Sequence, residues 1–146
     1  MSRTLIRFNA GTDFLSSLIR WRTGSRFNHC DFVLPDGTLL GAVPGVGVTR
    51  HSVGAEKAFA LYEVEIENGY EYAISQMRKP YDFGAIVGLG LPFPRNWQSD
   101  DKWFCSELLA ASLFKAGMPV VSSQSWGVTP RDLLLSPLFK PVNQPF

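Results

Sequence analysis

Residues 100–109 read DDKWFCSELL, and within this stretch a polar, irregular segment turns into an amphipathic helix. From Cys105 on, positions 105, 108, 109, 112, 113 and 116 carry Cys, Leu, Leu, Ser, Leu and Ala, the spacing of one buried helical face. Gly117 supplies the residue that ends the helix, and Pro119 prevents its continuation. The pattern predicts that Cys105 lies in the first turn and faces the protein interior.

A cysteine at this position has two interpretations. Backbone N–H groups at a helix start favour negative charge, so a thiol there ionises more easily than usual. Most cysteines on apolar helix faces, however, are buried structural residues. The stretch alone leaves both interpretations open, and the structural one is the commoner.

Length and composition restrict the class of protein. The chain has 146 residues, of which 45% are apolar and 13% aromatic, so residues 1–146 are expected to form one globular domain with a true core. The net charge of +1 argues against a nucleic-acid partner. The sequence shows neither a signal peptide nor an apolar run of about 18 residues, which predicts no membrane span and a cytoplasmic location.

Charge is unevenly distributed along the chain. Before His29 the only acidic residue is Asp13, against five arginines: Arg3, Arg7, Arg20, Arg22 and Arg26. Such a region suits an anionic ligand, although a solvated basic surface is the commoner explanation.

Several elements can be placed from local patterns. Pro35-Asp36-Gly37 is a strong turn signal between two apolar segments, which predicts a β-hairpin. Asn68 is expected to cap a helix, and Thr129-Pro130 to begin a short one. The tail, residues 139–146, is expected to wrap over the surface. The other expected elements are strands over 4–8, near 48, over 60–66 and over 120–125, and a helix over 12–22.

A nucleophilic cysteine needs a base within hydrogen-bond reach, usually a histidine, and a group that orients that base. His29 and His51 are the two histidines of the chain. His29 comes just before the predicted hairpin, where its ring could face a helix start. On spacing alone, a single histidine is more often structural or exposed.

Five segments, taken in order, resemble the circularly permuted group of the NlpC-type papain-like cysteine peptidases, which includes relatives of lecithin:retinol acyltransferase. KPYDF at 79–83 and CSEL at 105–108 are the more specific matches. The others are the helix and TGS at 12–25, NHCDFV with Asp-Gly at 28–37, and TPRDL at 129–133. Together they cover most of the chain.

The resemblance implies an α+β fold, papain-like and circularly permuted, with an antiparallel sheet or half-barrel and the nucleophile helix packed against it. It implies that Cys105 is the nucleophile, that His29 is the general base, and that the backbone N–H of Cys105 helps to bind the oxyanion. The implied activity is that of a cysteine hydrolase. Such an enzyme would cleave an amide bond, in a cell-wall-type or other small peptide, through a thioester.

One position departs from the family pattern. The family usually has a polar residue there, which orients the imidazole, but this chain has Gly41. A backbone carbonyl, a water or another side chain must then serve; His51 is the first replacement considered, although a loop or surface histidine is the commoner description. A Gly41→Glu change is expected to raise turnover if orientation is the weakness.

Three further residues complete the candidate site. Tyr81 and Asp82 are motif residues near the family's site, and a structural tyrosine and a helix-capping aspartate explain them equally well. Asp31 is a possible alternative partner for the distal nitrogen of His29.

Two other functions stay open. The same dyad could serve an acyltransferase or lipid hydrolase with an apolar channel lined by Ile86, Leu89 and Leu91. A non-catalytic binding module that keeps the fold is the other, and Gly41 favours it. No cofactor is expected, and no metal site, because the histidine and cysteine spacings fit no zinc pattern. Substrate identity and oligomeric state do not follow from the sequence.

Overall fold

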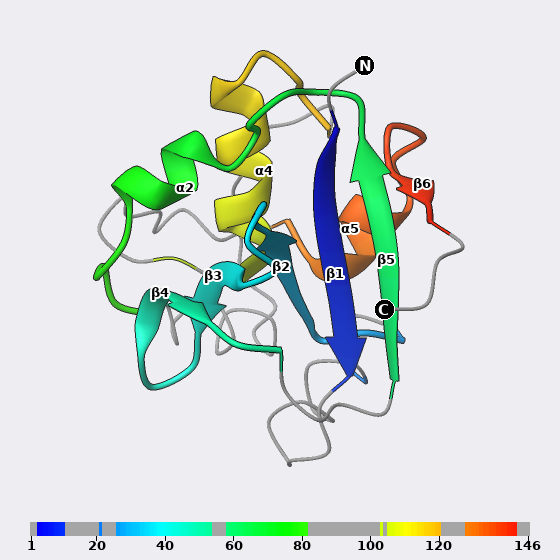
Figure 1. The fold of residues 1–146 in the computed structure, drawn as a ribbon. Coiled ribbons are helices and arrows are strands. Elements are labelled where there is room, and N and C mark those ends of the chain that lie inside the picture. The colour runs from blue at the N-terminus through cyan, green and yellow to red at the C-terminus, as the bar shows by residue number, and fades with distance from the viewer. Residues whose placement is uncertain are drawn as a thin grey trace, which may run out of the picture.

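An antiparallel sheet of six strands forms the framework of the molecule (Figure 1). The computed structural model describes residues 3–10, 21, 26–53, 58–81, 103, 105–120 and 128–142. The strand order across the sheet is β4-β3-β2-β1-β5-β6, and every neighbouring pair is antiparallel. The strands are β1 (Thr4–Ala10), β2 (His29–Val33), β3 (Leu39–Val43), β4 (Gly47–His51), β5 (Ala58–Val64) and β6 (Lys140–Pro141).

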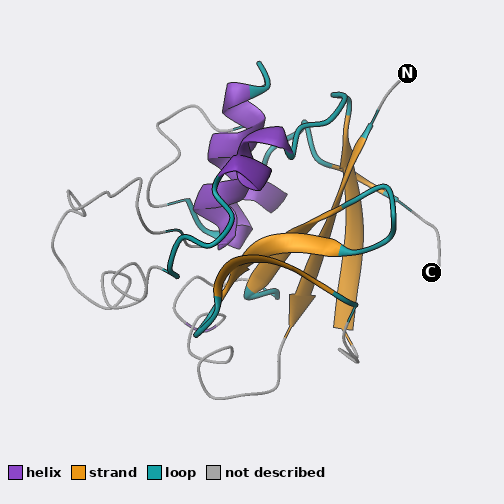
Figure 2. Ribbon diagram, turned by 60° about the vertical axis from the view of Figure 1, so that its left-hand side comes forward, coloured by secondary structure: helices purple, strands orange, loops and turns teal. Residues whose placement is uncertain are grey.

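The described helices gather on one side of this sheet (Figure 2). They are α2 (Glu71–Ser75), α4 (Cys105–Lys115) and α5 (Pro130–Leu134). Helix α4 packs against β2 and β3 and contacts both α2 and α5. The fold is therefore α+β, with the cysteine helix against the middle of the sheet. Among the described residues, no helix is both long and apolar enough to cross a membrane.

Apolar residues are buried on both faces of the sheet. Residues such as Phe8 and Phe32 belong to the large core that includes α4. Leu61, Val33 and Leu39 form a smaller cluster, which strand alternation places on the other face. The alternation of residues at 60–66 is typical of a strand with one buried face, and the second cluster explains why Leu61, on the opposite face, is buried as well.

Helix α4 is more enclosed than an amphipathic stripe predicts. Every residue from Cys105 to Leu113 is buried, because α2, α5 and the sheet cover different sides of the helix. Ala116, expected on the buried face, is exposed because the helix has ended by then. Gly117 has φ +98°, and the N–H of Met118 donates to the carbonyl of Leu113 at 2.8 Å, which closes a Schellman motif.

The turn and cap signals mostly hold. The hairpin joins β2 to β3 around Gly37, which has φ +86°. Thr129 and Asp132 form a reciprocal capping box at the start of α5. Asn68, however, is not the cap of α2: it has φ +52°, and Tyr70 occupies the N-cap position without a side-chain hydrogen bond.

Two more expectations need comment. Part of the tail is not a surface wrap: β6 pairs with β5, and Phe139 is buried against Phe8 with ring centroids 6.1 Å apart. The helix expected over 12–22 falls almost wholly outside the described residues, and the strand expected over 120–125 does so except for residue 120.

The segment after α2 links β4 to the start of α4. Arg78 and Lys79 exchange backbone hydrogen bonds of 2.8 Å with Val48, and the N–H of Trp103 donates to the carbonyl of Pro80 at 3.1 Å. Gly47 allows the close approach, because a Cβ there would lie 2.4 Å from the Lys79 carbonyl oxygen. Backbone contacts therefore set the position of α4 relative to the sheet edge.

Candidate active site

Cys105 is the first residue of α4, and its side chain is buried. Two contacts fix its position. The N–H of Trp103, just before the helix, donates a hydrogen bond to the carbonyl of Pro80, and the helix packs against β2 and β3. The sulfur lies 3.9 Å from the backbone carbonyl oxygen of Asn28. The thiol is thus held against the start of the strand that begins with His29.

His29 and Asp31 are two residues apart on β2, so strand alternation puts both side chains on one face. His29 Nε2 is hydrogen-bonded to Asp31 Oδ1 at 2.9 Å. The His29 side chain is 14% exposed and that of Asp31 only 1%, so solvent hardly weakens this pair. Because Asp31 occupies Nε2, Nδ1 is the nitrogen that remains for the thiol.

Gly41 leaves the space that the Asp31 carboxylate fills. A Cβ at position 41 would lie 2.0 Å from Asp31 Oδ1. The expectation that His51 is the first replacement is therefore wrong, since Asp31, the alternative partner named from the sequence, bonds His29 and the glycine makes room for it. The expected benefit of Gly41→Glu is reversed, because the new side chain would displace Asp31.

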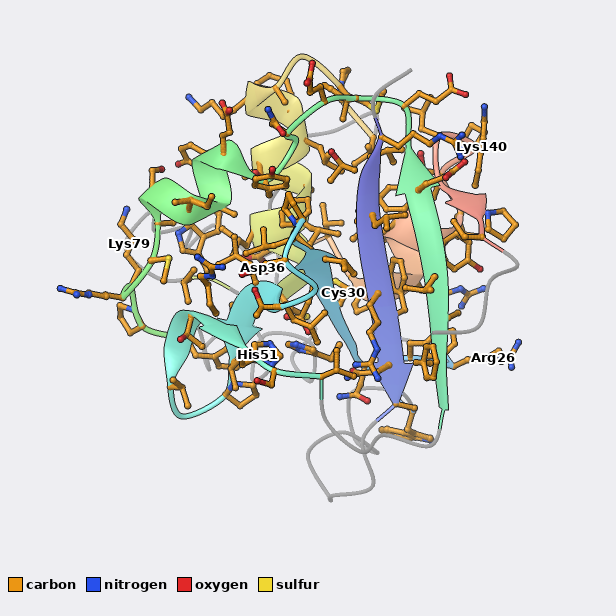
Figure 3. The ribbon with its side chains drawn as sticks, in the orientation of Figure 1. Arg26, Cys30, Asp36, His51, Lys79 and Lys140 are labelled. Atoms are coloured by element: carbon orange, nitrogen blue, oxygen red, sulfur yellow. The ribbon has the colours of Figure 1, made fainter. Side chains whose placement is uncertain are left out.

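His51 is the last residue of β4 and not a loop residue (Figure 3). Its Nε2 lies 3.3 Å from Asp31 Oδ1, outside the geometry of a hydrogen bond. Its ring centroid is 6.4 Å from that of His29. His51 therefore contacts the carboxylate and does not itself orient His29.

Asp31 dominates the electrostatics of the two histidines. Burial lowers the pKa of His29, but the charge of Asp31, its hydrogen bond, and Cys105 outweigh burial and raise that pKa well above its ordinary value. The pKa of His51 is raised by its contact with Asp31. The pKa of Asp31 itself is lowered, because the two histidines outweigh its burial.

The two cysteines are shifted in opposite directions. Burial raises the pKa of Cys105, but hydrogen bonds with Cys30 and His29, and the charge of His29, lower it to about 5. Burial and the neighbouring Cys105 raise the pKa of Cys30 well above its ordinary value. These shifts favour a Cys105 thiolate beside a protonated His29, and they favour the thiol form of Cys30.

The remaining predicted residues lie around this centre or outside the described chain. Tyr81 is buried in the main core and forms a parallel bridge with Trp103, so it helps to position the start of α4. Asp82 lies outside the described residues, as do Ile86, Leu89 and Leu91, the proposed channel.

The arginines before His29 have separate environments. Arg3 pairs with Glu63 at 2.8 Å on the exposed surface. The guanidinium of Arg7 is buried and lies 4.8 Å from the centroid of the Phe59 ring. Arg20 and Arg22 lie outside the described residues. The structure therefore gives no support to Arg3 as an anion ligand.

Sequence reasoning missed two features of the site. It did not anticipate that Cys30 lies beside Cys105 and helps to lower its pKa. It also ranked Asp31 behind His51 as the partner of His29. The alternation of a strand could have found Asp31, because residues two apart share a face and a glycine on the adjacent strand leaves that face open.

Comparison with known proteins gives a likeness of fold. No protein-family model matches the sequence, and no curated protein matches it. Among solved structures, the chain is similar to one from Escherichia coli O157:H7 described as metalloprotein yiiX, DUF1105. The likeness covers 99% of this chain and 98% of that chain, with a TM-score of 0.65 and 18% sequence identity.

Proposed function

We propose that the protein is a cysteine hydrolase of the circularly permuted papain-like type, which cleaves an amide bond through a Cys105–His29–Asp31 triad. The observation that carries the proposal is a helix-start thiol beside a histidine that is itself hydrogen-bonded to a buried carboxylate. A nucleophile, a base and an orienting group are the three parts that such catalysis requires. The substrate class we propose is a small peptide of cell-wall type.

The chemistry follows from these positions. The Cys105 thiolate attacks the amide carbonyl carbon, and the oxyanion that forms is bound by the backbone N–H of Cys105, one of the N–H groups without an intrahelical partner. His29 gives its proton to the departing amine, which leaves a thioester on Cys105.

In the second half, a water attacks the thioester carbonyl while His29 Nδ1 takes one of its protons. The acid leaves and the thiolate–imidazolium pair is restored. Asp31 holds the imidazole in one orientation throughout and stabilises its protonated form. Gly41 was the argument for a non-catalytic module, and Asp31 removes that argument because it supplies the carboxylate that position 41 lacks.

The test is to trap the thioester. The full chain is mixed with p-nitrophenyl acetate, a small activated ester, quenched in acid and digested for mass spectrometry. We expect an acetyl group on the peptide that contains Cys105, with Cys30→Ser as a control that keeps it. An unmodified Cys105, or acetylation that favours Cys30, would contradict the proposal. A panel of small peptide amides then identifies the substrate.

A further inference from the structure

The side chains of His29, Asp31 and His51 form a cluster, here called the Asp31 cluster, whose donor atoms face one another. Each residue offers one ligand atom, and the three atoms all lie within 4.8 Å of one another. His29 Nε2 and His51 Nε2 are 2.9 Å and 3.3 Å from Asp31 Oδ1. In a tetrahedral zinc site, bonds of about 2.0 Å put neighbouring ligand atoms roughly 3.3 Å apart. The two separations from Asp31 Oδ1 are thus close to the ligand spacing of a zinc site, and the third ligand atom lies within 4.8 Å of both others.

Two atoms of the cluster lack hydrogen-bond partners. Asp31 Oδ2 and His51 Nε2 are buried, and within the described part of the chain neither makes a hydrogen bond. Buried polar atoms in native proteins nearly always have a partner, and an exception asks for an explanation such as an ion. Both exceptions fall on the same three-residue cluster, and both atoms are of types that bind transition metals.

We propose that the Asp31 cluster is a binding site for a divalent transition metal, with Zn²⁺ as the preferred ion. Two imidazole nitrogens and one carboxylate oxygen form a common zinc ligand set, with the fourth position left for water. Imidazole ligands favour zinc over magnesium or calcium, which prefer oxygen. The His51 side chain is 31% exposed, so an ion can reach the cluster from that side.

Paired strands hold the three ligand side chains close together in the metal-free protein. His29 and Asp31 lie on β2 and His51 on β4, with β3 between them. At position 41, on β3, a side chain would overlap the carboxylate, so the glycine keeps the ligand oxygen accessible to both histidines. Ligands held by paired strands need little rearrangement to bind.

Metal binding would compete with the proposed catalysis. This competition rests on the proposed function, but the proposal of the metal site does not. A metal on Nε2 leaves the single imidazole proton on Nδ1. His29 then has no free nitrogen to accept a proton from the attacking water. The zinc-bound protein and the catalytically competent protein are therefore alternative states of one cluster.

The binding test uses the whole chain after treatment with a chelator and its removal. Calorimetric titration with Zn²⁺ should give one ion per chain. Asp31→Asn and His51→Ala should each weaken binding by more than about 100-fold, the upper range for losing even an outer partner of a ligand. Cys105→Ser should not weaken it, and the exposed-turn control Asp36→Asn should leave it unchanged. No binding by the wild-type chain, or equal binding by all variants, would overturn the proposal.

Absorption spectra of the Co²⁺-bound protein test the site without any substitution in the Asp31 cluster. Co²⁺ bound by two histidines and a carboxylate should give tetrahedral ligand-field bands without a thiolate-to-cobalt charge-transfer band. A charge-transfer band that disappears in Cys105→Ser would assign the metal to the thiol and refute the site. Zinc binding without thioester formation would refute the proposed hydrolase and support the metal site. Thioester formation without zinc binding would support the hydrolase and refute the metal site.

Discussion

The β2–β3 hairpin carries an aspartate at each end, and the two carboxylates have opposite surroundings. Asp36, in the turn, is exposed, accepts hydrogen bonds from the backbone and hydroxyl of Thr38, and pairs with Arg50. Asp31, near the open end, is buried with two histidines. The contacts of Asp36 with Thr38 and Arg50 lie in solvent, whereas the contacts of Asp31 with His29 and His51 surround a carboxylate that is only 1% exposed. Two identical side chains on one hairpin therefore contribute differently to stability and reactivity, because one is exposed and the other is buried.

The largest difference between the two aspartates is expected when the charge of each is removed in turn. Asp31→Asn should reduce the rate of turnover on the substrate found by the panel by about 10⁴-fold, because loss of the orienting carboxylate leaves the imidazole in the wrong tautomer. Asp36→Asn should leave the rate unchanged. Comparable rates for Asp31→Asn and the wild type, measured at one pH, would remove Asp31 from the site.

Glycine substitutions sharpen the same contrast in stability. Gly41→Ala should lower the free energy of unfolding by about 3 kcal/mol, because its Cβ would displace a buried, paired carboxylate. Gly37→Ala, the matched change in the turn, meets no atom within 4 Å and adds only backbone strain of about 1 kcal/mol at φ +86°. Urea unfolding of both variants measures the difference, and an equal loss would mean that Asp31 moves aside without cost.

His29, at the open end of the hairpin, also affects the reactivity of Cys105. Its pKa of about 5 predicts that alkylation by iodoacetamide, in chelator-containing buffer, falls as pH drops through 5, because the thiolate is then protonated. His29→Ala should slow alkylation at pH 6 by roughly tenfold, because the variant holds much less thiolate than the wild type. The loss is limited because the thiolate of higher pKa in the variant is the stronger nucleophile. Cys30 should stay unreactive there. A pH profile that is the same in the variant and the wild type would contradict the ion pair.

The smallest effect is expected at the exposed end. Arg50→Ala removes the Arg50–Asp36 pair, whose side chains are 48% and 52% exposed, and surface pairs of this kind contribute little. The urea midpoint and the alkylation rate of Cys105 should both match those of the wild type within error. A marked loss would show that the turn and the open end of the hairpin are coupled.

The same contrast explains what the sequence could predict. The turn at 35–37, the helix start at Thr129-Pro130 and the helix end at Gly117 each depend on a few adjacent residues, so local patterns found them. The choice of Cys105 and His29 as candidates came from the resemblance and from helix geometry. Strand alternation places Asp31 on the same face as His29, but the space for its carboxylate depends on the register of β2 against β3 and on the missing Cβ at position 41, which are contacts between strands.

The backbone contacts of Val48 bear on how the sheet meets other chains. A strand at a sheet edge offers unpaired N–H and carbonyl groups that can template aggregation. On β4, Val48 has both of its backbone groups engaged by Arg78 and Lys79. At the other edge, β6 is two residues long and one of them is Pro141, which has no N–H to donate. Each edge thus offers fewer free backbone groups to a strand of another chain at high concentration.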